Sequence, residues 1–192
     1  MRSPAAVLAV CEHCQTAVHW QPNGAAAAGT QASLSEGFTR LYRGATGQLD
    51  GERLEVLGRV RYRTEQAFWD EWFVRLGETD AWVTEDDHAL SLQVPADLGA
   101  LPPLVGLTAG TRFSVDGKAF EVDEVGEATC VGISGELPAA ILTGEVYRFI
   151  DASSLDGSMS LGVELDDEPP TAFLGRWLAH ESVVLDDEGA EW

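Results

Sequence analysis

A passage that occurs twice constrains the fold of this chain most strongly. Its copies span 41–56 and 107–122, and both read L-x-x-G-x-x-x-x, an apolar residue, then D-G-x-x-x-E-V. An Asp-Gly pair between short apolar-alternating runs is the strongest local signal for a β-hairpin. A repeated unit of this kind is typical of internal duplication. We therefore predict a mostly-β protein of two related small β-barrel- or sandwich-like units, preceded by a short cysteine knuckle.

The remaining sequence suggests where these units begin and end. Aromatic-rich and alternating runs between 54 and 94 are typical of strands, and a Pro-rich stretch then interrupts them. We predict a degenerate zinc-ribbon-like knuckle over 1–22, a linker over 23–40, a first β unit over 41–94, a Pro- and Gly-rich seam over 95–106, a second β unit over 107–180 and an acidic tail over 181–192.

The chain is strongly acidic. It has 12 basic and 32 acidic residues, for a net charge of −20, and its 45% hydrophobic content is sufficient for a buried core. Such a surface repels nucleic acid and anionic lipid, and it attracts cations or basic partners. We therefore expect no nucleic-acid partner, and either a protein partner or a cationic small molecule instead. Solubility alone is the simpler explanation of the same charge.

The sequence also bears on the cellular compartment. No apolar run approaches the roughly 20 residues that span a bilayer, so we expect no membrane-spanning segment. The apolar stretch 5–10 is shorter than the roughly 7–15 residues of a signal-peptide core. Cys11, Cys14 and Cys130 are too few for a disulfide framework, which fits a reducing compartment. We predict a cytoplasmic protein.

Cys11 and Cys14 have the C-x-x-C spacing with which two thiolates bind one zinc ion. A structural zinc site needs four ligands, and the sequence contains no second C-x-x-C. His13 or His19 could supply a third ligand, and we choose His19. A redox pair and a knuckle that holds no metal are the alternatives. We prefer the knuckle without metal, so we predict no cofactor and keep zinc as the alternative.

The W-D-E-W run that begins at Trp69 is the candidate ligand site. On a strand, Trp69 and Glu71 face one side while the aspartate and Trp72 face the other. Indole faces attract ammonium groups and carboxylates neutralise them, so this pairing suits a cation. Trp82 and Glu85 would join that surface if the next strand pairs antiparallel. Alternatively, the tryptophans form a core and the acids lie at its rim.

Arg59, Arg61 and Arg63 form a basic stripe on one face of a predicted strand. As a binding site, Arg59 and Arg61 would hold a phosphate or a carboxylate. As structure, they would pair across strands with Glu71 or Glu85. The sequence contains no G-x-S-x-G, no glycine-rich phosphate loop and no H-E-x-x-H. We therefore predict no catalytic residue and lean against an enzyme.

The residues around the W-D-E-W run resemble a bacterial family called domain of unknown function 4178. The matching positions, within about 41–178, are Gly58, Arg59, Tyr62, Trp69, Glu71, Trp72, Trp82, Glu85 and the later G-E-L-P at 135–138. The resemblance implies a β module without catalysis. Members often begin with a zinc-ribbon-like segment, which 3–14 resembles, although Gln15 stands where the family usually has glycine.

The leading functional hypothesis is a non-enzymatic binding or adaptor module in a bacterial stress- or envelope-linked accessory system. This hypothesis follows from the resemblance. Two others stay open. A sensor of polyamines or other cationic small molecules would use Trp69, Glu71, Trp72, Trp82 and Glu85. An acidic decoy that mimics the charge of DNA would space its carboxylates along one exposed ridge.

Overall fold

The structure is a computed structural model that describes residues 3–31, 34, 39–86, 89–98 and 106–186. Parts of the predicted linker, seam and acidic tail therefore lie outside the described residues. The mostly-β prediction is confirmed, and the one helix of the described part is a short 3-10 turn, His180–Ser182. In chain order the strands are β1 (Leu8–Val10), β2 (Thr16–Gln21), β3 (Gly24–Thr30), β4 (Thr46–Leu49), β5 (Glu52–Arg63), β6 (Phe68–Leu76), β7 (Thr79–Asp86), β8 (Ala89–Ala96), β9 (Arg112–Val115), β10 (Lys118–Leu137), β11 (Val146–Ser154), β12 (Ser160–Glu164), β13 (Thr171–Leu178) and β14 (Val183–Leu185).

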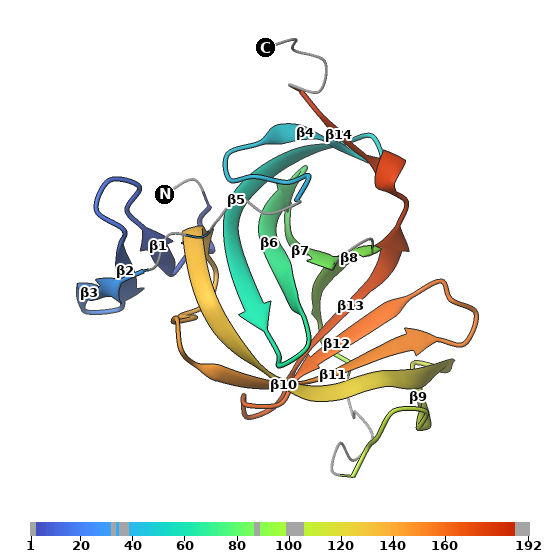
Figure 1. Cartoon of the computed structure of the whole chain (residues 1–192). Helices are drawn as coiled ribbons and strands as arrows, with labels where there is room; N and C mark the ends of the chain where they lie inside the picture. The colour runs from blue at the N-terminus through green and yellow to red at the C-terminus, as the bar shows by residue number, and fades with distance from the viewer. Residues whose placement is uncertain (1–2, 32–33, 35–38, 87–88, 99–105, 187–192) are drawn as a thin grey trace.

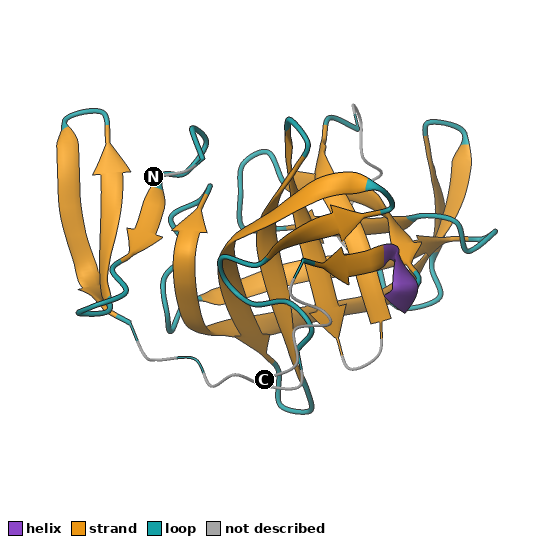
Figure 2. Ribbon diagram, turned by 90° about the horizontal axis from the view of Figure 1, so that it is seen from above, coloured by secondary structure: helices purple, strands orange, loops and turns teal. Residues whose placement is uncertain are grey.

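Most of the antiparallel sheet closes on itself as a ring (Figure 1). Its order is β5, β6, β7, β8, β13, β12, β11 and β10, and β10 pairs again with β5. The two stretches predicted as β units therefore build one common ring, with β5–β8 in the first half and β10–β13 in the second. Strands β1–β3 extend the sheet from the end of β10, to one side of the ring (Figure 2).

The repeated passage forms the same hairpin in both halves. Asp50 and Asp116 both have a φ of 49°, and the glycines that follow them, Gly51 and Gly117, have φ values of 86° and 79°. Positive φ at both central residues gives a turn whose twist matches that of the flanking strands. A β-bulge follows in both halves, directly after the valine that ends the passage. The local geometry of the two copies is therefore equivalent.

Where the halves meet, each strand pairs with its counterpart. Arg63 of β5 pairs with Thr129 of β10, and each lies at the same distance from its Asp-Gly turn. On the opposite side of the ring, Val94 of β8 pairs with Leu174 of β13. An approximate twofold axis therefore passes between these two pairs. The origin of the halves by duplication stays a prediction.

Three apolar clusters fill the space on both sides of the sheet. Trp72 and Val74 belong to a cluster on the outer face of the first half, which β4 and β14 close. Phe120 and Ile150 belong to the matching cluster of the second half. Phe73 lies in the third cluster, which occupies part of the ring interior. Each ring strand thus gives one face to an outer cluster and the other to the interior.

Two segments differ from the predicted boundaries. Gly24–Thr30, within the predicted linker, forms β3 and pairs with β2. Gly and Ala are depleted in strands, but backbone groups alone supply the ladder hydrogen bonds, so pairing with β2 outweighs this propensity. Val183–Leu185, within the predicted acidic tail, forms β14 and pairs with β4. Val183 and Leu185 are buried there, so apolar contact outweighs the acidic context. Among the described residues, no helix is long and apolar enough to span a membrane.

Candidate functional site

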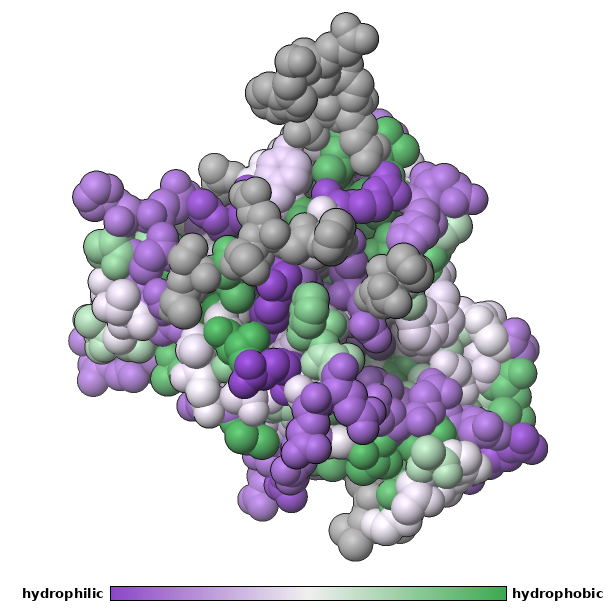
Figure 3. Space-filling model, in the orientation of Figure 1, coloured by the Kyte–Doolittle hydropathy of each residue, from purple (hydrophilic) through white to green (hydrophobic). Residues whose placement is uncertain are grey.

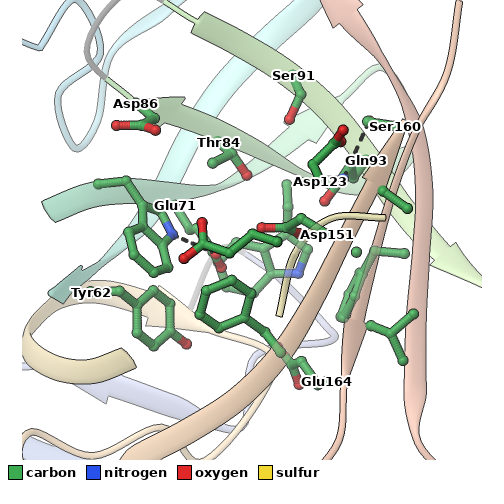
Figure 4. A pocket seen from close by; sticks show the side chains of 18 of the residues that line it. Tyr62, Glu71, Thr84, Asp86, Ser91, Gln93, Asp123, Asp151, Ser160 and Glu164 are labelled. Carbon is green, nitrogen blue, oxygen red and sulfur yellow. Dashed lines mark hydrogen bonds between the residues drawn. The ribbon is translucent and has the colours of Figure 1, made fainter. Parts of the chain in front are cut away.

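The ring encloses a cavity of about 300 Å³ (Figure 4). Every ring strand contributes to its wall, from Tyr62 on β5 to Phe173 on β13. This volume lies at the lower end of the range for ligand sites, which is about 300–1,000 Å³. The cavity therefore has the size for a small molecule.

The wall of the cavity is acidic and aromatic. Among the described residues that line it, none is lysine, arginine or histidine. Its carboxylates are Glu71, Asp86, Asp123, Glu124, Asp151 and Glu164. Its aromatic side chains are Tyr62, Trp69, Trp82, Tyr147, Phe149, Phe173 and Trp177. A concave wall with charges of one sign concentrates ions of the opposite sign.

Strand alternation brings Trp69 and Glu71 of the W-D-E-W run into this cavity. Trp69 and Glu71 face inward, and the Trp69 indole Nε1 donates a hydrogen bond to Glu71 Oε1 at 3.0 Å. Trp72 is buried in the outer cluster instead, so the predicted separation of the two faces is correct. Trp82 also lines the cavity, because the following strand pairs antiparallel with the first, as expected.

Burial changes the acidity of the inner carboxyls. It raises the pKa of Glu71 to about 8, although the hydrogen bond from Trp69 opposes this shift. The carboxyls of Glu164 and Asp151 add to the shift by repulsion. Burial likewise raises the pKa of Glu164 to about 7, with a further contribution from Asp167 and its neighbour Asp166. At neutral pH, the Glu71 and Glu164 carboxyls are therefore close to their pKa values, and both protonation states are populated.

Asp151 lies closer to solvent than these two carboxyls. Burial by the surrounding protein raises its pKa to about 7, and Glu124, Asp123 and Asp86 contribute by repulsion. Its side chain still keeps exposed surface, so water in the cavity moderates the shift. Within the described residues, Asp151 and Glu164 have no hydrogen bond or ion pair with another side chain.

Two hydroxyls of largely buried residues also face the cavity without a partner. Tyr62 and Ser91 are both 4% exposed, and both lie on the cavity wall (Figure 4). Neither hydroxyl has a hydrogen-bond partner in the described part of the chain. Both hydroxyl oxygens keep surface that is open to the cavity, so water satisfies them when no ligand is bound. Both hydroxyls can accept a hydrogen bond from a ligand.

A comparison with protein families identifies the family of this chain. The family described as Domain of unknown function (DUF4178) matches residues 43–180. The chain belongs to the DUF4178 family. Searches of curated proteins and of solved structures found no match. The matched residues include every strand of the ring, so the cavity lies within the DUF4178 domain.

The arginines proposed as ligand-binding residues lie on the outer face of the DUF4178 ring. Arg59 Nε and Nη2 donate to Asp70 Oδ1 and Oδ2, both at 2.8 Å. Arg61 Nε and Nη2 donate to the same two oxygens at 2.9 and 2.8 Å. All three residues are buried. Their partner is Asp70, and not Glu71 or Glu85 as expected, because Glu71 faces the ring interior.

Trp72 and Glu85 also lie outside the cavity. Trp72 Nε1 donates to Glu85 Oε2 at 3.1 Å, and the backbone N–H of Arg40 donates to Glu85 Oε1 at 2.9 Å. The Arg59 guanidinium lies 4.8 Å from the centre of the Trp72 ring. These residues therefore form a buried polar layer that supports the wall from behind.

The predicted metal residues lie at the other side of the molecule, in strands β1–β3. Cys11 and Cys14 are exposed in the turn between β1 and β2, and the Cys14 thiol donates to Thr16 Oγ1 at 3.2 Å. Gln15 has a φ of 58°, a left-handed conformation that favours glycine. Among the described residues, no three His, Cys, Asp or Glu side chains gather as a metal site requires. The two thiols therefore do not fit a four-ligand zinc site by themselves.

Sequence reasoning missed the part of the wall that comes from the second half. Asp151 and Glu164 are the main omissions, each a single carboxylate between apolar residues of its strand. Ile150 and Val163, their neighbours, are buried in the outer cluster, so alternation alone directs both acids inward. This alternation is visible in the sequence, but only the closure of the ring makes the face that carries these acids a cavity wall.

Proposed function

We propose that this protein binds a small organic cation, one that carries an ammonium group, inside the ring. The observation that supports it is the composition of the cavity wall, where carboxylates and aromatic rings gather without a basic residue among the described lining. The indoles of Trp69 and Trp82 would attract the ammonium group through their faces, while Glu71 and Glu164 neutralise its charge. The unpartnered Tyr62 hydroxyl would accept a hydrogen bond from it.

Binding of a cation would also remove an electrostatic cost. Burial holds the pKa of Glu71 near 8 and that of Glu164 near 7. A cation beside these carboxyls would favour their charged forms and lower both pKa values. Binding at neutral pH would therefore release protons, and affinity would increase as pH rises from about 6 to 8.

The other two hypotheses receive less support from the described residues. An adaptor would need a docking surface, and apolar side chains on the face seen in Figure 3 are scattered among hydrophilic ones. A decoy would need unpaired exposed carboxylates. Several exposed acids pair with arginine instead: Arg176 with Asp50, Arg148 with Asp166, and Arg112 with Glu121. The proposal also includes a cytoplasmic location for the protein. Ligand binding would there serve a sensing role in a bacterial stress- or envelope-linked system.

Calorimetric titration tests the proposal. The probes are spermidine, butylamine and tetramethylammonium, each at low and high salt. We expect at least one to bind stoichiometrically at both salt concentrations, because a buried site is screened less than a surface. Glu71→Gln, which keeps an acceptor for Trp69, should weaken binding about tenfold or more, which corresponds to about 1.4 kcal/mol.

Glu78→Gln is the matched control, because Glu78 is an exposed carboxylate in the turn between β6 and β7. It removes the same formal charge and should leave the affinity unchanged. Heats that vanish at high salt, or equal losses in the two variants, would reduce the interaction to nonspecific attraction by an acidic surface and refute the proposal.

A further inference from the structure

The carboxylates that line the cavity differ in solvent exposure. Glu71 and Glu164 are only partly exposed, and the adjoining Tyr62 is buried. Asp123 and Glu124 are exposed, as is Asp151. Both groups line one continuous cavity. The cavity therefore has an inner and an outer set of carboxylates, which we call the inner pair (Glu71, Glu164) and the outer set (Asp123, Glu124, Asp151).

The electrostatic neighbours of each carboxyl agree with this division. Glu71 interacts with Glu164, and both interact with Tyr62. Asp151 interacts with the other two members of the outer set. Asp151 also interacts with Glu71, so the two sets are in electrostatic contact. A single ammonium group in the inner pair would leave the outer set without a cation.

Apolar groups lie beside both sets, since Phe149 pairs with Glu164 and Gly162 pairs with Asp151. Trp69 and Phe149 lie edge to face with their ring centres 5.6 Å apart, and both line the cavity. Phe173 pairs with Gly162 and lines the cavity beside the outer set. Aromatic faces pack well against methylene groups, and glycine leaves room for them.

We infer, on the basis of the proposed function, that the ligand is a linear cation with two or more ammonium groups joined by methylene chains. One ammonium group lies at the inner pair, and the adjoining Tyr62 hydroxyl accepts from one of its N–H groups. The methylene chain runs along the aromatic side chains beside the two sets. A second ammonium group lies at the outer set, where Asp151 meets solvent.

A length series of diamines tests this inference. Calorimetry compares 1,3-diaminopropane, putrescine, cadaverine and 1,8-diaminooctane with the monoamines of equal chain length. We expect one diamine length to bind best, about tenfold or more tighter than its monoamine, because the second charge is also neutralised. Equal affinity of diamine and monoamine at every length would overturn the inference and leave simple cation binding intact.

Variants locate the two ends of the ligand. Glu71→Gln should weaken both the best diamine and its monoamine, whereas Asp151→Asn should weaken only the diamine. Glu124→Gln provides a second outer variant if Asp151→Asn fails to fold, and Glu78→Gln is the control for charge. Loss of both ligands in each outer variant would contradict two-point binding. If no amine binds at high salt, the proposed function fails, and the inference fails with it.

Discussion

At corresponding positions, the first half of the ring places aromatic side chains in the interior, whereas the second half places a carboxylate and a glycine there. In the first half, Phe73 pairs with Gly58 and Trp82, and in the second half Asp151 pairs with Glu124 and Gly162. The bulge residue is Leu57 in the first half and Asp123 in the second. The first-half residues Leu57, Phe73 and Trp82 are buried in the apolar cluster, while Asp123, Asp151 and Gly162 line the cavity.

This difference explains why the ring is filled at one end and open at the other. Phe73 and Trp82 pack with their ring centres 5.3 Å apart and fill the space that their backbone encloses. A carboxylate and a glycine at the same two positions leave that space empty. One backbone arrangement therefore fills the ring interior beside Phe73 and leaves the cavity open beside Asp151, although strands of both halves line that cavity.

The outer faces of the two halves also differ, in whether their cross-strand charges are buried or exposed. Asp70 of β6 pairs with Arg61 of β5, and at the corresponding place Arg148 of β11 pairs with Glu127 of β10. Asp70 is 1% exposed and bound by two arginines. Arg148 instead forms an exposed ion pair with Asp166. The first half thus depends on a buried charge network, and the second half does not.

The largest difference in stability should follow from these two ion pairs. Asp70→Asn leaves the buried Arg59 and Arg61 without their counter-charge and should reduce the free energy of unfolding by about 3–5 kcal/mol. Asp166→Asn breaks an exposed pair and should cost less than about 1 kcal/mol. Urea denaturation of both variants measures the two losses. Losses of similar size would mean that the buried network does not distinguish the halves.

The next effect concerns the cavity itself. Gly162→Trp places in the second half the side chain that Trp82 provides in the first. An added Cβ at Gly162 meets its nearest atom, Gln93 Oε1, at 3.4 Å, so the backbone accepts a side chain. The indole should occupy the cavity and weaken binding of the best amine by about tenfold or more. Gly162→Ala, titrated in the same calorimeter, should keep most of the affinity. Unchanged affinity in Gly162→Trp would place the ligand elsewhere.

The sequence predicted the local features of the fold well. Each Asp-Gly turn and the two faces of the W-D-E-W strand follow from residue spacing within a few positions. The closure of the ring does not, because the β5–β10 and β8–β13 pairings join strands far apart in the chain. Nothing in the alternation of one strand specifies its distant partner.

The residues of the candidate site also fall into two groups: those that local alternation predicts and those that depend on ring closure. Trp69, Glu71 and Trp82 line the cavity, since the alternation of one hairpin was sufficient to group them. Trp72 and Glu85 share the outer face with the arginines, so the proposed ligand set combined two sides of one sheet. Asp151 and Glu164 were not predicted because each is the single carboxylate of its strand, and ring closure alone brings both into the cavity.

The buried carboxyls predict how stability depends on pH. The pKa values of Glu71 and Glu164 are raised to about 8 and about 7, above the value of about 4.3 in unfolded chains. Between these values the folded protein keeps protons that the unfolded chain has lost, so unfolding releases protons. Stability without ligand should therefore fall as pH rises from about 5 to 8, by at least about 1 kcal/mol.

The correspondence between the halves supplies the variant that tests this pH effect. Thr84 pairs with Glu71, and Glu164 pairs with Phe149 at the corresponding place. Glu164→Thr gives the second half the residue of the first and removes one of the titrating groups. Urea denaturation at a series of pH values should show a shallower fall for this variant. An unchanged pH profile would show that Glu164 titrates normally, and that its burial does not disfavour the charged form.

The smallest effect should appear where the halves agree. Gly51 and Gly117 have φ values of 86° and 79°, and an added Cβ meets nothing within 4 Å at either position. The cost of Gly51→Ala and of Gly117→Ala therefore comes from the backbone alone, at about 1 kcal/mol each. Matched urea denaturations should give equal losses. A clear inequality would show that the two hairpins differ in strain although they share a turn, and that the difference between the halves extends beyond the interior of the ring.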